Sequence, residues 1–221
     1  MIKNKMSIIF NSLIVIFVFL ATFFMLIGFT IMEEKVVLDS PLDGFKYFTV
    51  DSNILMAISS IIFLYYLKTK REIPKKIYIL KYFATVSVSL TFLTVVLYLA
   101  PFSKYSFFAF FTNSNFFFHL VVPLLSIITF SCFEKTDKLY FSDTFFGLVP
   151  MLIYASFYMT NVFMHLENGK VDSKYDLYGF LKNGVDKTIL ILLIMITATY
   201  LICIMIYFMN KSKKSNINNQ L

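Results

Sequence analysis

The stretch Asn115-Phe-Phe-Phe-His119-Leu-Val-Val-Pro123-Leu-Leu125 is too apolar for anything other than a membrane-spanning helix. A hydrocarbon core about 30 Å thick needs roughly 20 apolar residues, each of which advances the helix by about 1.5 Å. An ionisable residue such as His119 costs roughly a few kcal/mol in hydrocarbon and is by default a functional-site hypothesis. The alternative is a neutral imidazole that hydrogen-bonds a neighbouring helix.

The rest of the chain has the same character. Its 221 residues are 58% hydrophobic and 15% charged, with a mean hydropathy of +0.75, whereas a soluble domain is about a quarter charged. Six stretches are long and apolar enough to span a membrane: approximately 8–32, 48–67, 77–100, 114–133, 143–163 and 188–209. The first follows two lysines, as a signal peptide would, but its apolar run reaches Met32, so we interpret it as a retained span.

These patterns predict an all-α, polytopic membrane protein with six transmembrane helices. All loops are short, so residues 1–210 form a single six-helix transmembrane domain. Residues 211–221 form a disordered basic tail.

The placement of charge predicts the orientation. The loops and tails on the side of the N-terminus hold twelve basic and three acidic residues, and those on the other side hold seven basic and eight acidic. The positive-inside rule therefore places both termini in the cytoplasm of a cell-membrane protein. The basic inner face suits anionic lipid headgroups, so the net charge of +7 needs no nucleic-acid partner.

Cysteine usage argues against a disulfide or a metal site. Cys132 and Cys203 are far apart in the sequence and show no metal-ligand spacing. The chain contains no cofactor motif, so we expect neither a cofactor nor a metal.

Polar residues collect at the predicted outer ends of the spans. Three pairs share the i,i+4 spacing that places both members on one helix face: Thr49 and Asn53, Asn115 and His119, and Asn161 and His165. We therefore predict one polar pocket in the outer leaflet, formed by three helices. The alternative is interhelical hydrogen bonding, worth about 0.6 to 2 kcal/mol per contact.

Two other ionisable residues have simpler interpretations. His165 lies near the water boundary, as an interfacial residue does. Lys81 lies one turn inside the third span, where we expect its long side chain to reach the inner headgroups.

The pocket residues suggest ester chemistry. Thr49 is a candidate nucleophile and His119 a candidate base, since an imidazole can remove the proton of an attacking hydroxyl. Asn53 or Asn115 would donate hydrogen bonds to the oxyanion. Asp51 either orients His119 or caps the helix. Counted along ideal helices, Thr49 and His119 differ in depth by roughly 6 Å.

Three short motifs resemble the androgen-induced/androgen-dependent six-helix membrane protein family, whose animal members hydrolyse fatty acid esters of hydroxy fatty acids. They are Lys46-Tyr47-Phe48-Thr49, Asn115-Phe-Phe-Phe-His119 with Pro123, and Tyr178-Gly179-Phe180-Leu181. The resemblance implies that Thr49 is the nucleophile and His119 its base. Gly179 stands where the family has proline, and Ser52-Asn53 resembles related bacterial integral membrane proteins of this architecture.

Two functions therefore follow from the sequence. The first is an intramembrane lipid-ester hydrolase or acyl-transfer enzyme, with Thr49 and His119 as catalytic residues and Asp51, Asn53, Asn115 and Asn161 around the substrate. The partner of such an enzyme is a membrane lipid or acyl ester. The second is a non-enzymatic membrane protein, such as a lipid-binding protein, small transporter or assembly factor. The apolar inner halves of the spans argue against a transporter, which needs a polar path to both faces.

Overall fold

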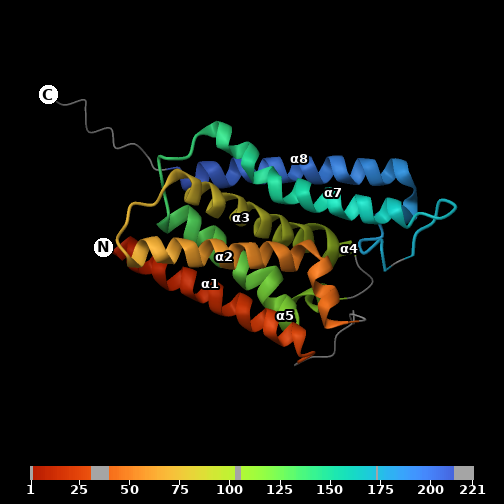
Figure 1. The fold of residues 1–221 in the computed structure, drawn as a ribbon, viewed down its shortest axis with the longest axis horizontal. Coiled ribbons are helices and arrows are strands. Elements are labelled where there is room, and N and C mark those ends of the chain that lie inside the picture. Colours follow the sequence, from red (N-terminus) through yellow and green to blue (C-terminus); the bar gives the residue numbers. More distant parts are fainter. Residues whose placement is uncertain (1, 31–39, 103–105, 173, 212–221) are drawn as a thin grey trace.

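The computed structural model describes residues 2–30, 40–102, 106–172 and 174–211 of the chain. Within these ranges all regular elements are helical, and strand pairing is limited to two isolated bridges. The start of α1 (Ile2–Leu26) and the end of α8 (Val185–Asn210) lie at one end of the elongated bundle (Figure 1). We call this end the termini end, and the opposite end, which carries segment 165–184, the loop end.

Six helices in the described residues are long and apolar enough to cross a membrane: Ile2–Leu26, Phe48–Lys68, Lys75–Phe102, Asn113–Phe133, Phe141–Met164 and Lys187–Asn210. The first two are α1 and α2. The third joins α3 (Lys75–Thr94), the π turn η2 (Val95–Leu99) and α4 (Ala100–Phe102). The fourth joins α5 (Asn113–Phe116), the π turn η4 (Phe117–Val121), α6 (Val122–Ile128) and the π turn η5 (Thr129–Phe133). The fifth joins η6 (Phe141–Leu148) and α7 (Val149–Met164), and the sixth belongs to α8 (Val185–Asn210).

Short 3-10 helices η1 (Pro41–Lys46), η3 (Phe107–Phe111) and η7 (Phe180–Asn183) lie in the connections at the loop end. The predicted all-helical class and the six long apolar helices are thus confirmed for the described residues. The predicted disordered tail, apart from Lys211, lies outside them.

The first span ends earlier than its apolar run. The sequence predicts a helix to residue 32, but α1 ends at Leu26. Gly28 adopts a left-handed conformation with a φ of 65°. The Phe29 N–H then donates to the Phe24 carbonyl and the Gly28 N–H to the Met25 carbonyl, the two bonds that close a helix at a glycine. One glycine therefore terminates a helix whose hydrophobicity continues.

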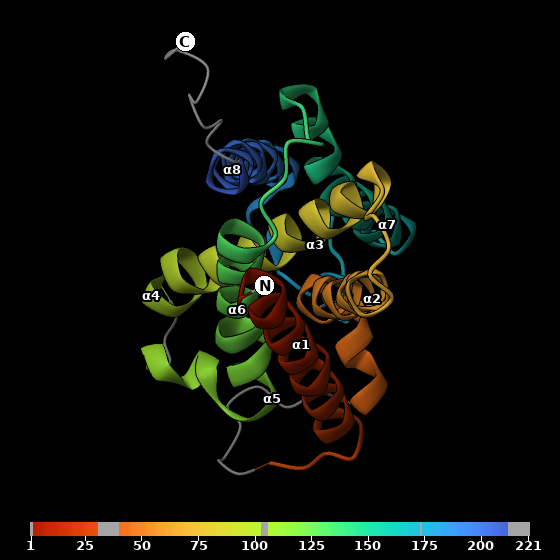
Figure 2. The same ribbon diagram turned by 90° about the vertical axis from the view of Figure 1, so that its left-hand side faces the viewer.

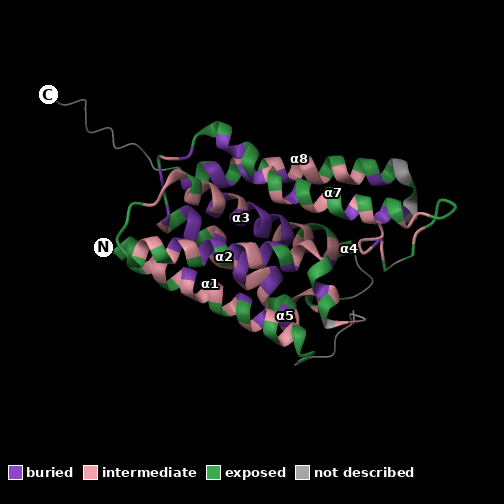
Figure 3. Cartoon of the chain, viewed as in Figure 1, coloured by how far each residue is buried: buried purple, intermediate pink, exposed green. Residues whose placement is uncertain are grey.

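The centre of the bundle is α3. Nearly every residue between positions 81 and 91 is buried, and Figure 3 shows the buried residues concentrated along this helix. Its hydroxyl groups bond the helix itself: Thr85 donates to the Lys81 carbonyl, and Ser89 donates to the Thr85 carbonyl. Small residues with satisfied hydroxyls allow neighbouring helices to approach closely without an unpaired polar group.

Two apolar clusters flank α3. On one side Ala84 and Val88 pack against residues of α1, α2 and the fourth span, including Ile14, Met56 and Phe118. On the other side a second cluster joins α3 to α7 and α8, and it contains these buried residues: Tyr82, Val86, Leu90, Phe130, Met151, Ile202, Cys203 and Ile206. Viewed from the termini end, α3 accordingly separates α1 and α2 from α8 (Figure 2).

Prolines follow two of the π turns. Pro101 comes after η2, and Pro123 comes after η4. Proline has no backbone N–H, so neither residue can bond the carbonyl four positions earlier, which belongs to Leu97 and His119 respectively. The helix accommodates this loss by winding locally with one extra residue per turn.

Candidate functional site

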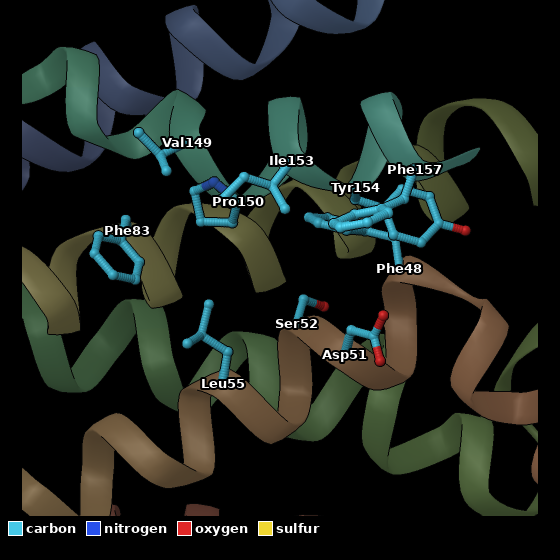
Figure 4. Close-up of a pocket in the computed structure, with 10 residues that line it drawn as sticks. All are labelled: Phe48, Asp51, Ser52, Leu55, Phe83, Val149, Pro150, Ile153, Tyr154 and Phe157. Atoms are coloured by element: carbon cyan, nitrogen blue, oxygen red, sulfur yellow. The ribbon is translucent and has the colours of Figure 1, made fainter. Parts of the chain in front are cut away.

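A groove of about 400 Å³ lies between α2, α3 and α7. Side chains of α2 and α7 face each other across it (Figure 4). Its lining is mostly apolar: Phe48, Leu55, Phe83, Val149, Pro150, Ile153 and Phe157. The polar groups are Asp51, Ser52 and Tyr154, all towards the start of α2. The groove is therefore an apolar channel with polar groups near the loop end.

Among these polar groups, the Asp51 carboxylate differs from its neighbours in being exposed. Ser52 is buried and shares a hydrogen bond of 3.2 Å with Thr91. The Tyr154 hydroxyl donates to the Lys46 carbonyl at 2.6 Å. Asp51 thus remains accessible to a hydrogen-bond donor on a ligand, whereas Ser52 and Tyr154 stabilise the helices.

His119 lies in the π turn η4 and is 8% exposed. Its Nδ1 is 2.7 Å from the Phe110 carbonyl oxygen, and its ring meets Phe111 edge-on. A carbonyl can only accept a hydrogen bond, so Nδ1 carries the proton and Nε2 keeps a free lone pair. His119 therefore connects η3 to the fourth span, and its Nε2 is unprotonated.

Asn53 connects the two helices that carry the predicted catalytic pair. It is buried, and its Nδ2 donates to the Thr49 carbonyl at 2.8 Å and to the Phe118 carbonyl at 3.1 Å. One amide nitrogen therefore bonds the carbonyls of Thr49 and of the residue before His119, so these two backbone segments lie side by side. Because both amide hydrogens are engaged, Asn53 in this arrangement offers an acceptor, and not a donor, to an oxyanion.

The side chains of the predicted pair do not meet. Thr49 is half-buried, and within the described part of the chain no hydrogen bond joins its hydroxyl to His119. Neither Thr49 nor His119 lines the groove that contains Asp51. The structure brings their backbones together without forming a nucleophile–base contact.

The remaining predicted residues are dispersed. Asn115 is exposed, one turn from His119. Asn161 donates to the Tyr175 carbonyl at 3.3 Å, while His165 stacks on the Tyr175 ring with centroids 3.5 Å apart. Both residues therefore contact Tyr175 of segment 165–184, and neither lines the groove. The predicted convergence of three helices on one pocket is therefore not seen in this structure.

Two of the three quoted motifs do come together. The Tyr178 hydroxyl accepts a hydrogen bond of 3.1 Å from the Phe48 N–H, and the Tyr178 ring meets Tyr47 edge-on at 5.9 Å. Segment 165–184 thereby packs on the start of α2.

Asp176, which the sequence did not single out, holds this segment in place. Its buried carboxylate accepts hydrogen bonds from the Tyr158 hydroxyl and from the backbone N–H groups of Phe180 and Leu181. Asp176 therefore anchors the start of η7, as acidic side chains at helix N-termini do.

A second polar cluster, near the termini end, contradicts the prediction for Lys81. The side chain does not reach the headgroups, because it is 0% exposed. Its Nζ donates to Asn11 Oδ1 and to Ser60 Oγ, each at 2.6 Å. Asn11 Nδ2 in turn donates to Glu134 Oε1 at 2.5 Å. Lys81, Asn11 and Glu134 form an amide-bridged ion pair in the interior, which sequence spacing alone did not reveal.

The comparisons with known proteins give no relatives for this chain: no protein-family model, curated protein or solved structure matches it.

Proposed function

We propose that this chain is a six-span membrane protein that binds a membrane lipid in the groove between α2 and α7. The observation that carries the proposal is an apolar channel of about 400 Å³ with an accessible carboxylate at one end. Ligand sites of several hundred Å³ with mostly apolar walls and a few oriented polar groups are typical of small-molecule binding. At membrane depth the abundant apolar ligand is a lipid chain.

The charge distribution supports the orientation. The basic loops gather at the termini end, so both termini are cytoplasmic and the polar end of the groove lies in the outer leaflet. The lipid would place its acyl chain against Leu55, Phe83 and Ile153, with its headgroup near Asp51 (Figure 4). A carboxylate accepts hydrogen bonds, so the headgroup carries an amine or a hydroxyl.

The groove can be tested by filling it. We expect Ile153→Trp to abolish photocrosslinking of the purified protein by a phospholipid with a photoreactive acyl chain. Leu152→Trp, on the adjacent exposed position outside the groove, is the matched control and should leave crosslinking unchanged. Asp51→Asn should retain crosslinking but reduce the preference for an ethanolamine over a choline headgroup. Equal crosslinking in Ile153→Trp and Leu152→Trp would contradict the proposal.

The second candidate is the lipid-ester hydrolase or acyl-transfer enzyme with Thr49 as nucleophile and His119 as base. It is favoured by the Asn53 bridge, which holds the Thr49 and Phe118 carbonyls side by side, and by the unprotonated Nε2 of His119. Catalytic hydrogen bonds are often long in unliganded enzymes and tighten when the substrate binds.

Two histidine variants separate this candidate from a structural role. Asparagine can donate to the Phe110 carbonyl in place of Nδ1 but has no counterpart of Nε2. If His119 acts as a base, His119→Asn retains the melting temperature and loses hydrolysis of a long-chain ester, as does Thr49→Val. If hydrolysis is absent from the wild type or persists in both variants, the enzyme assignment fails and the lipid-binding proposal is unaffected.

A further inference from the structure

A second cavity, of about 570 Å³, opens at the termini end, away from the lipid groove. It is formed by the start of α1, the end of α2 with the following loop, the start of α3, and the end of the fourth span. The buried side chains of Ser7, Phe63 and Glu134 form its inner part, and exposed lysines surround its opening. It belongs neither to the groove nor to the surroundings of His119.

The opening is positively charged. Lys3, Lys70, Lys135 and Arg71 are exposed and line the cavity, and the Arg71 guanidinium donates to the Tyr65 hydroxyl at 2.9 Å. A fourth lysine, Lys138, is neutralised, because its Nζ lies 2.7 Å from Glu72 Oε1 and lowers the pKa of that carboxyl. The three exposed ammonium groups and the Arg71 guanidinium therefore make the opening of the cavity positively charged.

The inner part presents an acceptor. Glu134 is 3% exposed, and its Oε1 accepts hydrogen bonds from Ser7 Oγ at 2.8 Å and from Asn11. Its Oε2 is buried and has no hydrogen-bond partner among the described residues. A buried carboxylate oxygen without a donor is costly, so the site lacks one hydrogen-bond donor.

We propose that this cavity binds a phosphate diester whose second substituent carries a hydroxyl or an amino group. The phosphate lies among Lys3, Lys70 and Lys135, and the donor of the substituent reaches Glu134 Oε2. The headgroups of phosphatidylglycerol and phosphatidylethanolamine have this chemistry, and so does free glycerophosphodiester. The cavity opens where two spans end, so a membrane phospholipid reaches it from the bilayer, while its soluble counterpart reaches it from water.

The first experiment compares ligands on the wild-type protein in detergent, with melting temperature as the readout. Phosphatidylglycerol and phosphatidylethanolamine should raise the melting temperature more than phosphatidylcholine, whose headgroup has no donor. Glycerophosphoglycerol and inorganic phosphate distinguish the sources: stabilisation by the lipid alone identifies a membrane ligand, and equal stabilisation by the soluble diester identifies a soluble one. No stabilisation by any of the phosphate diesters, or an equal effect of phosphatidylcholine, would overturn the proposal.

The second experiment localises the site. The triple variant Lys3→Gln, Lys70→Gln and Lys135→Gln should weaken phosphatidylglycerol binding by about a hundredfold at low salt. Each of the three lysines is expected to contribute about equally to the affinity for an anionic headgroup. The matched control is Lys5→Gln, Lys68→Gln and Lys76→Gln, three exposed lysines near the same end that do not line the cavity. Equal weakening by both triple variants would show a diffuse basic face and would refute a built site.

Glu134→Gln tests the inner part. Glutamine keeps an oxygen for Ser7 and Asn11 but places an N–H donor where Oε2 stood. Affinity for phosphatidylglycerol should fall to that for phosphatidylcholine, while the phosphate contribution remains. If this variant fails to fold, the headgroup comparison on the wild-type protein still decides the question. Failure at this cavity leaves the groove between α2 and α7 unaffected, because the two sites share no residue.

Discussion

The buried side chain of Lys81 lies at the centre of a polar cluster inside the bundle. Its ammonium is fully buried, and the compensating carboxylate of Glu134 is reached through the Asn11 amide. An unpaired charge in the interior is far costlier than a surface charge, so the three residues depend on one another.

We expect Lys81→Met to lower the free energy of unfolding by about 3 to 5 kcal/mol, because it leaves Glu134 as an uncompensated buried charge. Lys76→Met, at an exposed position of the same helix, should change it by no more than about 0.5 kcal/mol. The measurement is detergent-based unfolding followed by circular dichroism. Adding Glu134→Gln to Lys81→Met should recover a large part of the loss; equal stabilities for the two lysine variants would refute the ion-pair role.

At residue scale, sequence reasoning identified polar residues but not their partners. The sequence assigns Asn53 and His119 to a polar pocket within the bundle, and both are buried. Their partners, however, are backbone carbonyls, which every residue carries and no pattern distinguishes. Lys81 was misplaced because its neighbours Asn11 and Glu134 come from other spans, and pairing across spans depends on packing.

At the scale of single elements, close packing depends on individual glycines. Gly147 in η6 lies against α3 and α8: a Cβ added there would overlap Cys203 Sγ and would lie 3.2 Å from the Tyr82 ring. Gly28 is different, because a Cβ there would meet open space and only its left-handed backbone conformation resists substitution. A substitution at Gly147 therefore tests a steric effect, and a substitution at Gly28 tests the effect of the backbone conformation.

Gly147→Ala should lower the free energy of unfolding by about 1 to 3 kcal/mol through overpacking. The effect should be smaller in a Cys203→Ala background, which removes the nearest obstructing atom. Gly28→Ala should cost about 1 kcal/mol in either background, since no atom obstructs it. Thermal unfolding by circular dichroism of the four combinations measures both couplings, and an equal Gly147→Ala effect with and without Cys203 would contradict the steric explanation.

Element boundaries show where sequence periodicity stops being informative. Most spans begin and end within a few residues of the predicted limits, because hydrophobic length decides them. The π turns are different: they place an extra residue per turn at η4, so i,i+4 spacing across Asn115 and His119 no longer guarantees a shared face. Accordingly Asn115 is exposed while His119 is buried.

For the whole molecule, the bundle has two chemically distinct ends. The termini end carries the basic cavity, and the loop end carries the polar end of the groove and segment 165–184. Hydropathy and charge placement are sufficient to predict that the two ends of the bundle differ chemically. They could not predict that segment 165–184 packs onto α2 through Tyr178 and onto α7 through Asp176, because these contacts join side chains and backbone groups distant in sequence.

The orientation can be measured by cysteine labelling in intact cells. In a Cys132→Ser and Cys203→Ala background, Lys170→Cys at the loop end should react with a membrane-impermeant maleimide without permeabilisation. Lys76→Cys at the termini end should react only after permeabilisation. Both positions are exposed, so accessibility within the fold is matched. The reverse pattern would invert the proposed topology and place the basic cavity outside the cell.

The amide-bridged ion pair also has a consequence for biosynthesis. Asn11 is synthesised first, Lys81 follows two spans later, and Glu134 comes only after the fourth span is complete. During translation the third span therefore carries a positive charge whose counter-ion has not yet been made. Partitioning this helix into lipid on its own is unfavourable, so the nascent chain is expected to wait beside the translocation channel until the fourth span emerges. We expect the first four spans to enter the bilayer as one unit before α8 packs against them.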